Sequence, residues 1–302
     1  MHKSISALFA TTMFTAPVFA DQLRVLVDIP PIHGIVNGVL GSNASITTLI
    51  GSGIDPHNYT MKPSHAAAVS EADLIVLIGG VLTPSLAEKL PSLANNAKII
   101  DLAKVPNVHL IAYEDAHDDH AREQEHNEHE HDGHDHSGVD PHMWLDIDNA
   151  DVWAHAIAKS ASELSPALTS DINAQLAAFD QALIGLKSEM KTLTTKPYSV
   201  SHDAFAYLEE SFGIDHPQAV TNSVGLRPSP SDIANLRAQI ETTPPACMII
   251  DPNDHTALAY ALAEEYSIKT VEFSQLGEIV EGENAYLNLM QGAVAAFKTC
   301  FQ

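Results

Sequence analysis

The chain has 302 residues, of which 45% are hydrophobic, and it carries 15 Lys and Arg against 39 Asp and Glu, a formal net charge of −24. This composition is typical of a globular protein with one or two domains and excludes a disordered or fibrous chain. The acidic balance argues against nucleic acid and anionic membrane surfaces as partners, because both attract Lys and Arg. The unusual feature is the 17 His, more than Lys and Arg together.

The first 20 residues have the pattern of an export signal. Lys3 precedes a short apolar core over Ile5–Phe14, and small residues lead up to Ala20. We expect cleavage after Ala20 and an exported chain, the alternative being a short buried N-terminal helix. No other stretch is long enough to span a bilayer and no Cys follows the cleavage point, so we expect no membrane anchor.

Two halves of the chain repeat an alternation of short apolar runs and helical segments. Strands are expected over Leu23–Ile29, Ile46–Ile50, Leu74–Ile78, Lys98–Leu102, Tyr198–Ser201, Pro217–Val220, Cys247–Ile250 and Thr270–Phe273. Helices are expected over Lys62–Glu71, Ser85–Leu93, Asn149–Ser160, Asp203–Phe212, Ser231–Glu241, His255–Tyr266 and Asn284–Phe297. The alternation predicts an α/β fold with a parallel sheet in each half, and ligands bind beyond the carboxyl ends of such strands.

A long helical pattern lies between the halves. Seven apolar residues recur there at steps of three and four: Ile172, Leu176, Phe179, Leu183, Leu186, Met190 and Leu193. The pattern predicts one helix over Pro166–Thr194, roughly 43 Å long, which we interpret as a rigid connection between two lobes. A coiled-coil partner helix is the alternative. The predicted division is a signal peptide over 1–20, an N-terminal lobe over 21–163, a connecting helix over 164–195 and a C-terminal lobe over 196–302.

The segment His117–Ser137 is of low complexity. Its only basic residue besides His is Arg122, and almost nothing in it is apolar, so we expect a disordered surface loop. Its imidazoles predict weak collection of metal ions without fixed geometry, the alternative being a purely solvating acidic loop. The seven imidazoles belong to His117, His120, His126, His129, His131, His134 and His136.

The two cysteines, Cys247 and Cys300, predict one disulfide in an exported chain. It would join the last helix to the sheet and stabilise the fold by about 4 kcal/mol in the chain-entropy model. Free or metal-binding thiols are the alternative.

Three further histidines lie beside predicted strands or at helix starts. His57 follows the strand Ile46–Ile50, His142 precedes the Asn149–Ser160 helix, and His202 follows a strand of the second half. Three neutral imidazoles with an open fourth position form a common zinc arrangement. A single loop histidine is more often an ordinary hydrogen-bonding residue, so spacing alone leaves that alternative open.

The sequence around these histidines resembles the periplasmic metal-binding proteins that serve zinc and manganese ABC importers. The resemblance covers nearly the whole chain after Ala20 and is carried by Gly53-x-Asp55-Pro56-His57-x-Tyr59 with Lys62-Pro63-Ser64, by Asp140-Pro-His142-x-Trp144-Leu-Asp146, and by His202-Asp-Ala-Phe-x-Tyr-Leu-Glu209 through Gly213. The His-rich loop before the second motif and the cysteine pair are similar to the zinc-specific (ZnuA-like) branch. The segment Phe273–Gly277 has no acid, where manganese-binding relatives usually supply a carboxylate.

The resemblance implies that His57, His142 and His202 bind Zn²⁺ as cargo between two lobes and that the protein delivers it to an ABC permease. It also implies a periplasmic, monomeric binding protein and not an enzyme. The fourth ligand stays open between water, Asp55 and a loop histidine, because Pro56 stands where some zinc members have Glu. A manganese-binding or adhesin-type relative and, less favoured, a zinc hydrolase are the alternatives.

The remaining histidines of ordered segments are expected to have ordinary roles. His33 follows the first strand, and relatives often have a nearby His that does not bind metal. No motif surrounds His65, His155, His216 or His255. Protonation of imidazole ligands is expected to weaken metal binding as the pH falls below about 6.5.

Overall fold

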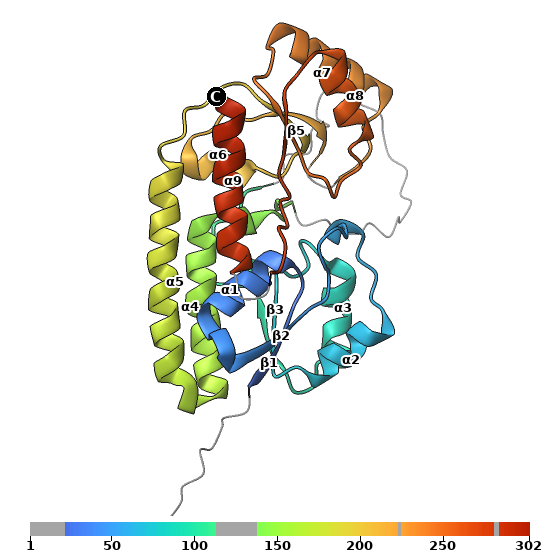
Figure 1. Ribbon diagram of the computed structural model, residues 1–302. Helices are drawn as coiled ribbons and strands as arrows, with labels where there is room; N and C mark the ends of the chain where they lie inside the picture. Colours follow the sequence, from blue (N-terminus) through green and yellow to red (C-terminus); the bar gives the residue numbers. More distant parts are fainter. Residues whose placement is uncertain (1–21, 113–137, 223–224, 281–283) are drawn as a thin grey trace, which may run out of the picture.

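The computed structural model describes residues 22–112, 138–222, 225–280 and 284–302, and the predicted export signal and the His-rich segment lie outside them. The described chain forms two lobes, each built on a four-stranded parallel sheet with flanking helices (Figure 1). This architecture confirms the predicted α/β fold class. The N-terminal sheet contains β1 (Leu23–Val27), β2 (Ala44–Thr48), β3 (Leu74–Leu77) and β4 (Lys98–Asp101). The C-terminal sheet contains β5 (Ser199–His202), β6 (Gln218–Thr221), β7 (Met248–Ile250) and β8 (Thr270–Glu272).

The two sheets have equivalent strand orders, β2-β1-β3-β4 and β6-β5-β7-β8. All of their strand pairs are parallel; Val25, for example, lies opposite both Ile46 and Leu74. Parallel strands place their carboxyl ends at one edge of a sheet, where the following loops gather. Loops of the two lobes meet there, since the Ser52 hydroxyl after β2 donates to the carbonyl of Gly277 after β8 (3.1 Å).

Helix α1 (Pro30–Leu40) is not predicted from the sequence pattern, because two prolines and two glycines make the segment a weak helix former. The prolines occupy its first positions, where their missing N–H groups are not needed. A Cβ atom built at Gly34 would lie 2.1 Å from the backbone nitrogen of Tyr286, so glycine allows α1 and the C-terminal helix to approach closely. The other helices of the N-terminal sheet are α2 (Pro63–Glu71) and α3 (Pro84–Leu93).

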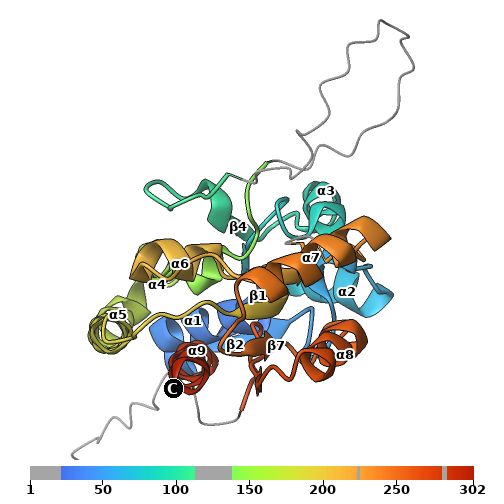
Figure 2. The same ribbon diagram turned by 90° about the horizontal axis from the view of Figure 1, so that it is seen from above.

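Two long helices run side by side along one flank of the molecule (Figures 1 and 2). Helix α4 spans Ile147–Leu164, and α5 spans Thr169–Met190 after a 3₁₀ turn at Pro166–Leu168. The predicted helix Pro166–Thr194 is therefore too long at both ends, because Pro166 opens a tighter turn and the chain leaves the helix after Met190. The predicted apolar stripe is confirmed, since five of its members are buried: Ile172, Phe179, Leu183, Leu186 and Met190.

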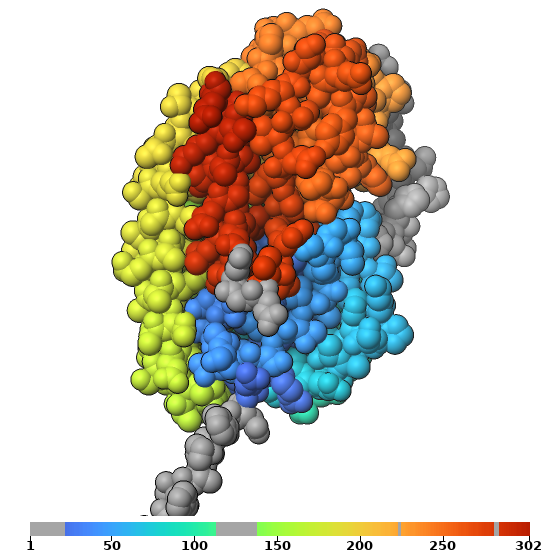
Figure 3. Space-filling model, viewed as in Figure 1, coloured from blue at the N-terminus to red at the C-terminus, as the bar shows by residue number. Residues whose placement is uncertain are grey.

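The C-terminal lobe carries the remaining helices, α6 (Ala206–Phe212), α7 (Pro230–Thr242), α8 (Ala257–Glu265) and α9 (Ala285–Phe301). A disulfide joins Cys247, directly before β7, to Cys300 in α9, with Cα atoms 5.3 Å apart, and confirms the predicted pair. In Figure 1, α9 extends from the C-terminal lobe down to α1, and the space-filling view shows the C-terminal lobe seated directly on the N-terminal lobe (Figure 3). The lobes are thus joined by packed helices as well as by the connecting chain.

No helix in the described part of the chain is both long and apolar enough to cross a membrane.

Candidate metal centre

Three histidines from separate segments converge between the lobes. His57 lies in a 3₁₀ turn (Pro56–Asn58) after β2, His142 caps another (Met143–Leu145), and His202 is the last residue of β5. One ring nitrogen of each lies within 4.8 Å of the others. The ring centroids are 5.0 to 5.7 Å apart. The structure therefore brings together the three histidines that the sequence motifs single out, two from the N-terminal side and one from the C-terminal lobe.

His142 is oriented by a buried carboxylate. Asp140 Oδ1 lies 2.8 Å from His142 Nδ1 and accepts a hydrogen bond from the backbone N–H of the same residue (2.8 Å). Both side chains are buried, that of His142 completely. A carboxylate behind Nδ1 makes this nitrogen the donor and leaves Nε2 with a free lone pair for a metal ion.

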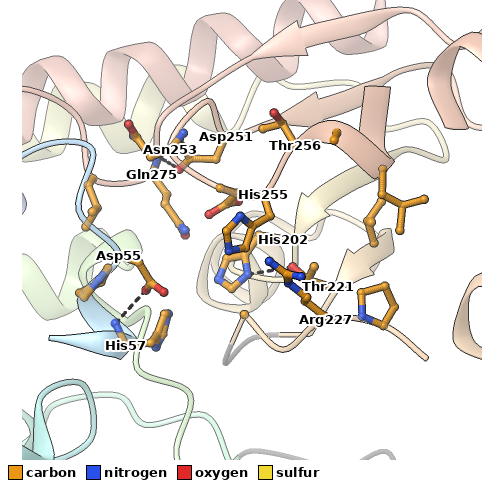
Figure 4. Close-up of a pocket in the computed structure, with 18 of the residues that line it drawn as sticks. Asp55, His57, His202, Thr221, Arg227, Asp251, Asn253, His255, Thr256 and Gln275 are labelled. Atoms are coloured by element: carbon orange, nitrogen blue, oxygen red, sulfur yellow. Dashed lines mark hydrogen bonds between the residues drawn. The ribbon is translucent and has the colours of Figure 1, made fainter. Parts of the chain in front are cut away.

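His202 is oriented by a hydroxyl group. Its Nδ1 lies 3.3 Å from Thr221 Oγ1 (Figure 4), and this hydroxyl donates its own proton to the carbonyl of Ser201 (3.0 Å). Thr221 Oγ1 thus accepts from Nδ1–H, and Nε2 of His202 is the unprotonated nitrogen.

The two unprotonated nitrogens face each other. Nε2 of His202 lies 3.1 Å from Nε2 of His142. Two ligands of one tetrahedral zinc ion, each about 2.0–2.1 Å from the metal, are about 3.3–3.4 Å apart. The spacing of these lone pairs therefore fits two ligands of a single ion, which would remove their mutual repulsion.

The third histidine, His57, lies in a turn that is capped by the side chain of Asp55. Asp55 Oδ1 accepts from the backbone N–H of His57 (2.9 Å), and Asp55 Oδ2 accepts from Asn58 Nδ2 (2.7 Å). Both carboxylate oxygens of Asp55 are thus used to hold the loop, and Asp55 is outside the ligand group that the described residues form. His57 Nε2 is buried without a hydrogen-bond partner. A buried ring nitrogen without a partner is costly unless a ligand satisfies it.

Burial keeps the imidazoles of His57 and His202 neutral. Burial, followed by the neighbouring His142 ring, lowers the pKa of His57 to about 4. Burial also holds the pKa of His202 well below its ordinary range, with smaller contributions from the rings of His142 and His57. Neutral imidazoles are the metal-binding form, so at His57 and His202 protons compete with a metal ion at a lower pH than the value of about 6.5 expected from sequence.

A cavity of about 740 Å³ opens beside His57 and His202. It is lined by the carboxylates of Asp55, Asp251 and Asp254, with Arg227 as its one lysine or arginine among the described residues. Burial, reinforced by Asp251, raises the pKa of Asp254 to about 7. Figure 4 shows Asp55, Asp251 and Arg227 in the wall of this cavity together with His57 and His202. A cation entering the cavity would be attracted by the carboxylates and would favour their ionised forms.

The sequence motifs do not single out Thr221, Asp251 or Asp254. Thr221 and Asp251 directly follow predicted strands, so the rule that ligand groups gather at the carboxyl ends of parallel strands could have found them. His33 is hydrogen-bonded to Thr48 (Nδ1 to Oγ1, 3.0 Å) and is not among the described metal-ligating groups. The seven histidines of the His-rich segment lie outside the described residues.

Residues 25–300 match the ZnuA family model, described as the periplasmic component A of a zinc-uptake complex. The chain belongs to the ZnuA family. It is 30% identical to the high-affinity zinc uptake system protein ZnuA of Paracoccus denitrificans, in an alignment that covers 99% of each chain.

Solved structures of other proteins share the fold. A crystal structure of ZnuA has a TM-score of 0.75 and 23% identity, covering 92% of this chain and 98% of that one. The periplasmic zinc-binding protein TroA from Treponema pallidum has a TM-score of 0.77 and 18% identity, covering 93% and 99%. Membership of the ZnuA family confirms the predicted role in zinc uptake, and it makes zinc the cargo of a solute-binding protein.

Proposed function

We propose that this ZnuA family member captures Zn²⁺ between its lobes with His57, His142 and His202 and delivers it to an ABC permease for uptake. The observation that carries the proposal is the convergence of three imidazoles from both lobes. Asp140 accepts from Nδ1–H of His142 and Thr221 accepts from Nδ1–H of His202, which leaves Nε2 of each ring free to bind a metal ion. An all-imidazole ligand set favours zinc over manganese, which prefers oxygen ligands. The transport family supports a binding role over zinc-dependent hydrolysis.

The fourth ligand is proposed to be a water molecule from the interlobe cavity. His57 and His202 line that cavity, so the open side of the three-histidine group faces it. Asp55 is the weaker candidate, because its two oxygens cap the turn that holds His57. A histidine of the His117–Ser137 loop remains the second candidate and would replace the water.

We propose that zinc binding links the two lobes and tilts them only slightly relative to each other, without a wide hinge closure. Besides the Ser52 contact, the buried Trp144 indole N–H donates to the carbonyl of Gln275 (2.9 Å), and Asn284 Nδ2 donates to the carbonyl of Gly34 (2.9 Å). These contacts join the two lobes across their boundary. A large hinge motion would have to break them, whereas a ligand bound to both lobes can tilt them slightly.

The remaining parts of the proposal concern export, oligomeric state and the His-rich loop. We propose that cleavage after Ala20 releases a periplasmic monomer without a membrane anchor. We also propose that the loop His117–Ser137 gathers Zn²⁺ weakly and raises its concentration near the cleft.

Calorimetric titration of the chain from residue 21 with Zn²⁺ and Mn²⁺ tests the proposal. We expect one tight zinc site, much weaker manganese binding, and a tight site that survives deletion of residues 117–137. H142A should lose more zinc affinity than the roughly 10–100-fold typical of residues behind a ligand. H33A is the matched control, because this histidine lies outside the ligand group. Tight binding that persists in H142A, or that disappears with the loop, would contradict the proposed site.

A further inference from the structure

The cavity beside the three histidines is much larger than the zinc ion and its water require. Its volume is about 740 Å³, whereas about 10–15 Å³ is enough to hold one water molecule. Pockets of roughly 300–1,000 Å³ are typical of sites that enclose small organic molecules. The space therefore fits a zinc ion together with an organic ligand better than a hydrated ion alone.

The walls of the cavity combine apolar surface with a few charged groups. Val220, Ile233 and Leu258 of the C-terminal lobe contribute apolar side chains. Apolar walls with a small number of converging polar groups are the usual composition of a site for a small organic molecule. A bare cation gains nothing from the apolar part of such a wall, so this part indicates a ligand with carbon atoms.

The charged groups of the wall favour a ligand without net charge. Among the described residues that line the cavity, the charged side chains are Asp55, Asp251, Asp254 and Arg227. With the carboxylates ionised, these side chains leave two negative charges, which one Zn²⁺ balances. In Figure 4, Arg227 and Asp251 lie on different sides of His202. A neutral ligand with separate positive and negative groups would find a partner for each of them.

The wall also holds a polar atom without a partner. Gln275 lines the cavity and is only 7% exposed, and its Oε1 accepts no hydrogen bond in the described structure. Rotation of the terminal amide exchanges its oxygen and its nitrogen, so Oε1 can be turned toward the cavity. An N–H group of a bound ligand would satisfy it there.

We propose that the cavity takes zinc together with a small zwitterionic chelator of the α-amino-acid class, represented by free L-histidine. This inference rests on the proposed function, because the imidazole of the amino acid replaces water as the fourth ligand of zinc on the three protein histidines. The carboxylate of the amino acid pairs with Arg227, and its ammonium group faces Asp251 and Asp254. The captured cargo is then a zinc–amino acid complex and not the hydrated ion.

Equilibrium dialysis of the full mature chain with radiolabelled L-histidine tests this inference. The chain is dialysed at neutral pH with and without one equivalent of Zn²⁺, and the histidine and zinc retained per chain are both measured. We expect about one histidine per bound zinc and none in the absence of zinc. R227Q and D254N should each retain histidine about tenfold more weakly, as the loss of a hydrogen bond to a charged group predicts.

R237Q is the matched control, since Arg237 of α7 pairs with Glu265 and does not line the cavity. It should retain histidine as the wild type does. Radiolabelled citrate, an anionic zinc chelator, should not be retained. Arg227 is exposed, so R227Q tests the inference independently of how D254N folds.

The outcomes separate this inference from the proposed function. A wild-type chain that binds one zinc tightly but retains no histidine would overturn the inference and leave the proposed function intact. A chain without tight zinc binding would overturn both. Equal retention of histidine in wild type, R227Q and D254N, or retention of citrate in place of histidine, would also overturn the inference.

Discussion

Replacing Asp140 by alanine removes the carboxylate behind His142 and leaves all three proposed zinc ligands in place. In the structure, Asp140 Oδ1 lies 2.8 Å from both the backbone nitrogen and Nδ1 of His142, so it fixes the tautomer and the orientation of the ring. Residues in this position behind metal-ligating histidines typically account for about 10–100-fold in metal affinity. We therefore expect the zinc dissociation constant of D140A to rise by this factor, or about 1.4–2.7 kcal/mol.

Competition with a chromophoric chelator at neutral pH measures this change. D140N should lose less affinity, because its amide oxygen can still accept from Nδ1–H of His142 although the negative charge is gone. D148A is the control, since Asp148 is an exposed acid that pairs with Lys187 and not with a ligand. The reasoning is refuted if folded D140A, with a normal thermal unfolding transition, binds zinc as tightly as the wild type.

Two further predictions follow from burial and close packing. Burial lowers the pKa of His57 to about 4 and holds that of His202 well below its ordinary range, so zinc affinity titrated downward from neutral pH should fall most steeply near the lower value. A steepest fall at about 6.5, the ordinary imidazole value, would contradict this. Gly34→Ala should lower the free energy of unfolding by about 1–3 kcal/mol, because the added Cβ would lie 2.1 Å from Tyr286 N. Gly185→Ala in α5, with no heavy atom within 4 Å of the added Cβ, should raise it by up to about 1 kcal/mol, and urea unfolding that shows equal changes in both variants would count against this packing argument.

The metal-binding histidines could be named from the sequence because each stands in a local motif. His57 lies beside its capping Asp55, and His142 lies two residues from Asp140, so the residues that shape these two loops are neighbours in the chain. The acceptor for His202 is different, because Thr221 lies 19 residues away and reaches it only through the pairing of β5 with β6. Its role therefore required the sheet.

The sequence by itself determined the alternation of strands and helices and the buried stripe of α5, because both follow from hydrophobic periodicity along the chain. It also determined the disulfide partner of Cys247, because the chain has only one other cysteine. Tertiary structure alone decided that Pro30–Leu40 is helical, since its weak helix propensity is overcome by burial against other helices and by the close approach of α9 at Gly34. It also decided the lowered pKa of His57. These properties arise from burial and from contacts between residues distant in sequence, which no local pattern encodes.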